Sequence, residues 1–97
     1  MSWIVAAVVH GEECALTGPG KRDIKGRDGS KIGESAWVTK RDHATPDRSP
    51  KDWWKKYAWI FELENDAKAA LNILNEKIAA GQCSDFNKPT RAWVEEL

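Results

Sequence analysis

Two adjacent tryptophans stand between lysines in the stretch SPKDWWKKYAW, residues 49–59. This pattern is typical of surfaces that hold single-stranded nucleic acid, because indole rings stack on bases while lysines neutralise phosphates. Neighbouring side chains point about 100° apart in a helix and about 180° apart in a strand, so only one of Trp53 and Trp54 can face a given partner. Tyr57 follows Trp53 by four residues, which favours Trp53 in the core and Trp54 near the surface.

Basic residues concentrate in the middle of a chain that is neutral as a whole. The 97 residues include fifteen basic and fifteen acidic side chains, but residues 21–56 hold eleven basic and six acidic ones. A partner attracted by charge would therefore meet this segment first, although the interspersed acids weaken the basic patch. The residues predicted to contact a partner are Trp54, Lys51, Lys55, Lys56, Lys21, Arg22, Lys25, Arg27 and Arg41.

The segment ALTGPGKR, residues 15–22, is the nearest approach to a phosphate-binding loop. The Walker pattern needs a glycine at its first position and a hydroxyl residue at its last, where this segment has Ala15 and Arg22. Nucleotide hydrolysis is therefore not expected. The glycines could still cradle an anion with backbone N–H groups, whereas a charged surface loop would need no ligand.

Metal binding and catalysis have few candidate residues. The candidate ligands are His10, Cys14, His43 and Cys83. Zinc sites usually show two close ligand pairs, and here only His10 and Cys14 are near each other in sequence. Asp42 stands beside His43, but adjacent residues in an extended loop point apart, so they do not indicate a catalytic triad. We predict no metal, no cofactor and no enzymatic activity.

Length and composition favour one small cytoplasmic domain. A chain of this size builds one hydrophobic core, so residues 1–97 are expected to form a single domain. The longest apolar run, Trp3–Val9, is much shorter than the roughly 20 residues that cross a bilayer, and no membrane contact is expected. Two cysteines are too few for a disulfide scaffold, which favours a reducing compartment and no Cys14–Cys83 bridge.

The first part of the chain predicts a hairpin, a loop and a third strand. Residues 2–10 are rich in β-branched residues and almost continuously apolar, as in a strand at the centre of a sheet. Gly11 supplies a turn, after which residues 14–17 return as the second strand of a hairpin. Residues 18–34 contain five glycines and predict a flexible basic loop. Residues 35–39 predict a short strand.

Signals for a short helix and another strand follow. Ser49 can cap a helix and Pro50 suits its first position, so a short helix is predicted near residues 50–56. Residues 57–63 then alternate with a period of two, which predicts a strand. The side chains expected on one face of that strand are Tyr57, Trp59, Phe61 and Leu63.

The C-terminal part predicts a long helix and a last strand. Asn65 is expected to cap a helix over residues 66–80, whose apolar residues recur at helical spacing and which stops at Gly81. Residues 90–97 alternate and predict the last strand.

This order of elements predicts an α+β fold, with a mainly antiparallel sheet of four or five strands and the long helix packed on one face. One helix covers only one face of a sheet. With six tryptophans in the chain, the other face needs a cover from loops, from a second copy in a homodimer, or from a partner.

Two segments resemble small phage and prophage open reading frames. They are YAWIFELENDAKAALNIL at residues 57–74, a strand leading into an alanine-rich helix, and ESAWVTKRDHAT at residues 34–45. Such viral proteins are often accessory factors, including anti-CRISPR inhibitors of host defence, that bind without catalysis in the host cytoplasm. The resemblance implies a protein-binding module that inhibits a host protein or complex. The alternative is a small nucleic-acid-binding domain that uses Trp54 and the basic central third.

Overall fold

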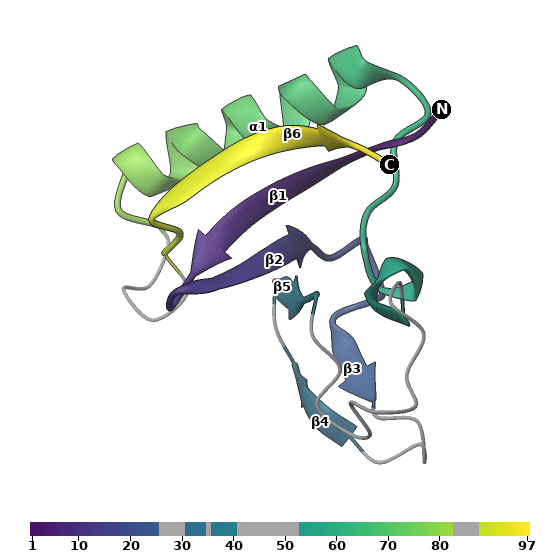
Figure 1. The fold of residues 1–97 in the computed structure, drawn as a ribbon. Coiled ribbons are helices and arrows are strands. Elements are labelled where there is room, and N and C mark those ends of the chain that lie inside the picture. Colours follow the sequence, from purple (N-terminus) through teal and green to yellow (C-terminus); the bar gives the residue numbers. More distant parts are fainter. Residues whose placement is uncertain (26–30, 35, 41–52, 83–87) are drawn as a thin grey trace.

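A computed structural model describes residues 1–25, 31–34, 36–40, 53–82 and 88–97 of the chain. Its centre is a four-stranded antiparallel sheet in the order β5-β2-β1-β6 (Figure 1). The strands of this sheet are β1 (Trp3–Val9), β2 (Glu12–Leu16), β5 (Trp37–Thr39) and β6 (Arg91–Glu96). The long helix α1 (Glu64–Ala79) packs against β1 and β6, and it lies partly behind β6 in the view of Figure 1. The predicted α+β class is confirmed.

Strand β1 occupies the centre of the sheet, between β2 and β6, as its apolar sequence predicts. The side chains of Ile4, Val5, Ala6 and Ala7 are all fully buried. Because successive side chains of a strand point to opposite faces, both faces of the sheet are apolar at β1. Each face therefore needs a cover.

A two-residue turn joins β1 to β2. Val9 pairs with Glu12, which leaves only His10 and Gly11 between the strands. Their φ angles are 53° and 77°, and positive φ at both central residues defines the type I′ turn that matches the twist of a hairpin. Glycine adopts this conformation at little cost. The predicted hairpin is confirmed, with β2 beginning at Glu12 rather than at Cys14.

Helix α1 covers one face of the sheet. Ala67 of α1 is fully buried, and its small methyl side chain lets the helix backbone approach the strands closely. The helix begins at Glu64, after an extended Leu63 that makes no side-chain cap, so the predicted cap at Asn65 is wrong. A cap contributes only about 1 kcal/mol, and tertiary packing contributes most of a helix's stability. Gly81, with φ of 72°, ends the helix as predicted.

The 3₁₀ helix η1 (Trp53–Lys56) and the residues after it cover part of the opposite face. The buried residues of this second core are Ile4, Ala6, Ala15, Val38, Trp54, Tyr57 and Ala58. Trp54 is only 6% exposed, so the expectation that it lies near the surface is wrong. Ala6 and Ala15 pair across β1 and β2, and two methyl groups leave room for an indole. The side chain of Trp53 lies outside the described residues.

The prediction of a strand over residues 57–63 is wrong. Only Ala58 and Phe61 form bridges, and they pair with two different elements, Ala58 with Thr17 after β2 and Phe61 with Trp3 of β1. The segment therefore crosses the end of the sheet instead of running beside one strand. Tyr57 joins the core opposite α1, whereas Phe61 packs in the core beneath α1. An alternating pattern does not distinguish such a crossing from a strand.

The remaining expectations concern the middle of the chain. The segment predicted as a loop contains a two-stranded antiparallel ribbon, β3 (Asp23–Lys25) with β4 (Lys31–Glu34). In Figure 1 this ribbon lies away from α1. The third strand of the main sheet is confirmed as β5. The short helix is found over Trp53–Lys56, while residues 50–52 lie outside the described part.

We predict that Trp54→Ala lowers the free energy of unfolding by about 3 to 5 kcal/mol, because it removes a large ring from the core opposite α1. This would be a large share of the stability of a small domain. The urea unfolding midpoint measures the loss. Ile60→Ala is the control, since Ile60 is 42% exposed. Equal midpoints for the two variants would contradict the placement of Trp54 in the core.

Candidate functional site

An open groove of about 620 Å³ runs between α1 and the end of the sheet. The size is within the range of about 300 to 1,000 Å³ found for ligand pockets. Its lining residues are Leu16, Thr17, Arg22, Ala36, Trp59, Phe61, Asp66, Ala69, Ala70, Ile73, Leu74 and Lys77. Most of these side chains are apolar, and three of them, Arg22, Asp66 and Lys77, are charged. The groove is the candidate functional site of the described part of the chain.

One wall of the groove is a single stripe along α1. The stripe consists of Asp66, Ala69, Ala70, Ile73, Leu74 and Lys77. Residues three and four apart lie on the same side of a helix, so this spacing makes a continuous wall. Ala70 and Leu74 are half-buried where the stripe adjoins the core, and Ile73 is 54% exposed. The apolar stripe of α1 is thus wider than its contact with the sheet.

The opposite wall is held by backbone hydrogen bonds at the end of the sheet. Trp59 N–H donates to the Leu16 carbonyl at 2.9 Å, and Phe61 N–H donates to the Trp3 carbonyl at 2.8 Å. The rings of Trp59 and Phe61 stack with centroids 4.8 Å apart. Because its backbone is tied to the sheet at both points, this aromatic wall is formed before any ligand arrives.

Charged side chains stand at the edges of the groove. Asp66 lies in the first turn of α1 and Lys77 in its last, and both are exposed, as is Arg22. Within the described residues none of the three takes part in an ion pair, whereas Glu64 and Lys68, elsewhere on α1, pair at 2.8 Å. These three charges are therefore available to a molecule that enters the groove.

The groove suits binding through apolar contact. Its walls offer aromatic and aliphatic surface, with charges only at the edges. In the part of the chain that the structure describes, no group of three or more His, Cys, Asp and Glu side chains could hold a metal ion. His43 and Cys83 lie outside that part.

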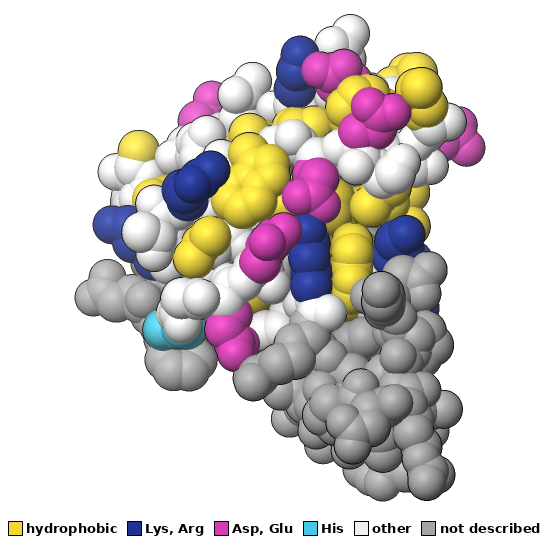
Figure 2. Space-filling model, viewed as in Figure 1, with side chains coloured by type: hydrophobic (Ala, Val, Ile, Leu, Met, Phe, Trp, Pro, Cys, Tyr) yellow, Lys and Arg dark blue, Asp and Glu magenta, His cyan; other side chains and the backbone are white. Residues whose placement is uncertain are grey.

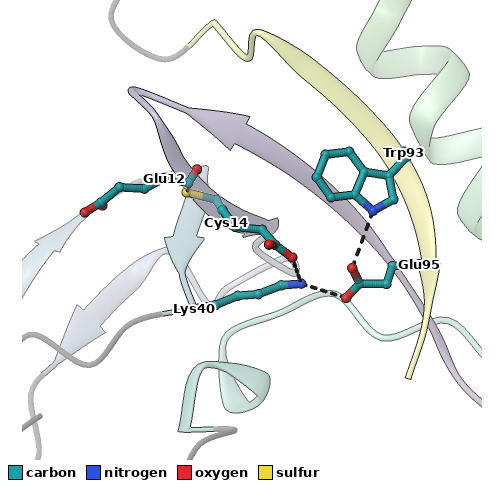
Figure 3. Close-up of polar contacts among 6 residues, drawn as sticks. Glu12, Cys14, Lys40, Trp93 and Glu95 are labelled. Carbon is teal, nitrogen blue, oxygen red and sulfur yellow. Dashed lines mark hydrogen bonds and ion pairs between the residues drawn. The ribbon is translucent and has the colours of Figure 1, made fainter.

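Apart from the groove, a cluster of charged and polar side chains lies on the face of the sheet opposite α1. Figure 2 shows this face, with acidic and basic side chains intermingled with hydrophobic ones. Lys40, just after β5, donates hydrogen bonds to Glu13 of β2 at 2.5 Å and to Glu95 of β6 at 2.6 Å. Trp93 Nε1–H donates to the same Glu95 carboxylate at 3.4 Å (Figure 3). The Lys40 ammonium thus links β2 to β6 across β1.

The environment of Lys40 favours its charged form. Burial lowers the pKa of the ammonium, but the hydrogen bonds to Glu13 and Glu95 outweigh this effect and raise the pKa above its ordinary value of 10.5. The ammonium also lies 5.2 Å from the centroid of the Trp54 ring, within the range of a cation–π contact. A lysine held in this charged state is a poor proton acceptor at neutral pH. The cluster is structural and does not indicate catalysis.

Cys14 is a buried free thiol beneath α1. Burial, together with the nearby Glu12 carboxylate, raises its pKa to about 11. Its Sγ also contacts the Glu12 carbonyl at 3.5 Å. Because the thiolate is the nucleophilic form, this cysteine is suited to packing and not to reaction.

The structure describes six of the nine predicted contact residues. Trp54 is buried. The ammonium of Lys55 lies 5.9 Å from its ring, and that of Lys56 lies 5.1 Å from the ring of Tyr57. The others divide into the exposed Lys21, the groove residue Arg22, Lys25 in β3, and Lys51, Arg27 and Arg41 outside the described residues.

The groove residues other than Arg22 were not predicted as a site. The sequence signal that indicates them is Ile73, an apolar residue one position before Leu74 and therefore beside the core stripe of α1. The sequence does not single out Trp59, whose 37% exposure follows from the fold.

Comparison of the chain with family models, curated proteins and solved structures found no match. Among the helices of the described residues, none has the length and apolar character needed to span a membrane.

We predict that the ion cluster of Lys40 stabilises the fold below the ordinary lysine pKa and that this contribution is lost as the pH rises through the raised folded-state value. The free energy of unfolding should begin to fall as the pH rises past the ordinary lysine pKa of 10.5, and it should fall less in Lys40→Met. Urea unfolding at a series of pH values measures the difference. Lys88→Met, at an exposed position, is the control. Parallel curves for wild type and Lys40→Met would rule out this role.

We also predict that Cys14 does not react with a thiol reagent in the folded protein. At pH 8 a pKa of about 11 leaves roughly one thiol in a thousand ionised, and the side chain is buried. The measurement is the rate of labelling of a Cys83→Ser variant, whose only thiol is Cys14. Labelling of Cys14 should occur only when urea unfolds the protein. Complete labelling within seconds in native buffer would show that Cys14 is accessible.

Proposed function

We propose that the protein is a non-enzymatic binding module that accepts an apolar segment of a partner protein in the groove between α1 and the Trp59–Phe61 wall. The observation that carries the proposal is the groove itself, which is largely apolar and open to solvent. Backbone hydrogen bonds to the sheet hold its Trp59–Phe61 wall in place. A role as a small phage-type accessory or inhibitor protein, acting on a host protein or complex, agrees with this mode of binding.

The exposed rings and aliphatic groups of the groove favour an apolar partner. Trp59 is 37% and Ile73 is 54% exposed, and both line the same groove. Transfer of such surface from water to an interface contributes roughly 25 cal/mol per Å². The preformed walls lower the entropy that has to be lost on binding.

A protein is favoured over nucleic acid as the partner. Trp54, whose ring was expected to stack on bases, is buried as part of the core opposite α1. The edges of the groove carry Asp66 as well as Arg22 and Lys77, so the groove does not offer phosphate a uniformly positive surface. Both signs of charge at the rim of an apolar centre are typical of protein interfaces.

We predict that Ile73→Glu weakens partner binding by about 2 kcal/mol or more, because it places a carboxylate in the apolar centre of the interface. The partner is first identified by placing a photo-crosslinking amino acid at position 73 and mapping the linked residue by mass spectrometry. The affinity of the purified partner is then measured by titration, for wild type and variant.

Ile60→Glu is the matched control, since Ile60 is also exposed but lies outside the groove. Unfolding curves verify that both variants are folded. If the two variants bind equally well, the groove is not the interface. A salt series completes the test, because an affinity that falls steeply with salt would indicate nucleic acid instead.

A further inference from the structure

The shape of the groove limits what can fill it. The α1 wall extends from Asp66 to Lys77, which is about 16 Å at a rise of 1.5 Å per residue. An occupant that follows this wall would be a helix of about three turns or an extended segment of about five residues.

A helix satisfies its own backbone, and an extended segment does not. The N–H groups of Thr17, Trp59 and Phe61 on the opposite wall already donate to the carbonyls of Ala36, Leu16 and Trp3. The α1 wall offers only side chains. An extended peptide in the groove would therefore leave buried backbone groups unpaired along α1, which is costly.

The middle of the α1 wall is suited to a packed helix. Ala69 and Ala70 lie there, with Ile73 and Leu74 following in the next turn. Small side chains at a contact allow two helix axes to approach to about 8 Å, and larger ones hold them near 10 Å. A helix with an apolar stripe would pack against these four residues on one side and against Trp59 and Phe61 on the other.

The charges at the two ends of the wall give the helix a direction. Asp66 is in the first turn of α1 and Lys77 in its last. A helix antiparallel to α1 places its N-terminal turn beside Lys77 and its C-terminal turn beside Asp66. Acidic residues are favoured in the first turn of a helix and basic residues in the last, so the dipole of the incoming helix and the charges of the groove favour the same pattern.

We infer that the occupant is an amphipathic α-helix of about three turns that lies antiparallel to α1, acidic at its N-terminal end and basic at its C-terminal end. The inference rests on the proposed function and adds the conformation, direction and charge of the partner segment. It also assigns Asp66 and Lys77 as the residues that determine specificity.

A displayed library of random 16-residue peptides tests the inference. It is selected on the immobilised full chain and counter-selected on Ala69→Trp, which fills the groove. Ala79→Trp, also exposed on α1 but outside the groove, is the control that should still bind. The enriched peptides should have apolar residues at i, i+3, i+4 and i+7, an acid in the first turn and a base in the last. Circular dichroism should show a gain of helix on binding.

Charge reversal tests the direction. The double variant Asp66→Lys, Lys77→Glu keeps the net charge and should bind the selected peptides about tenfold more weakly than the wild type does. Peptides in which the acidic and basic ends are exchanged should bind the double variant more tightly than they bind the wild type. The control is Glu64→Lys, Lys68→Glu, which reverses an existing ion pair of α1 outside the groove and should change little.

The outcomes separate the two proposals. Peptides that depend on the groove but alternate with a period of two, or that show no helix, would overturn the helical occupant and leave the proposed function standing. Helical peptides with the opposite charge order, or insensitive to the reversal, would overturn the direction. Recovery of no peptide whose binding depends on the groove would count against the proposed function and the inference together.

Discussion

The burial of β1 on both of its faces is the constraint on which the rest of the structure depends. Its residues from Ile4 to Ala7 are fully buried and alternate between the two faces. Helix α1 covers one face, and Trp54 with Tyr57 covers part of the other. The groove opens beside α1 where its contact with the sheet ends, and the Lys40 cluster occupies the opposite face.

The elements that are determined locally could be predicted from the sequence. An almost continuously apolar run, rich in β-branched residues and followed by a His-Gly turn, specifies the first hairpin. The repeat of Ala67, Leu71, Leu74 and Ile78 specifies the helix. Residues 57–63 could not be interpreted correctly in this way. Their alternation reflects contact with two elements in turn, first the end of β2 and then the start of β1, and such contacts depend on the whole sheet.

The candidate site could be predicted only in part. Arg22 was expected in a binding surface and does line the groove, but the tryptophan expected beside it is in the core. The choice between Trp53 and Trp54 rested on a spacing of four residues, which applies to an α-helix, whereas η1 is a 3₁₀ helix with three residues per turn. The groove joins Leu16, Phe61 and Ile73, which are distant in sequence, so only the fold brings them together.

The pairing of β1 with β6 also determines how the fold would respond to force. The two strands are antiparallel and adjacent, and the Leu97 N–H donates to the Ser2 carbonyl at 2.8 Å where β6 ends and β1 begins (Figure 1). A pull on these two residues acts across the strands and loads one hydrogen bond at a time, from Ser2 inward. The sheet would open like a zipper at low tension, whereas a pull along the strand axes would load all the bonds between β1 and β6 together.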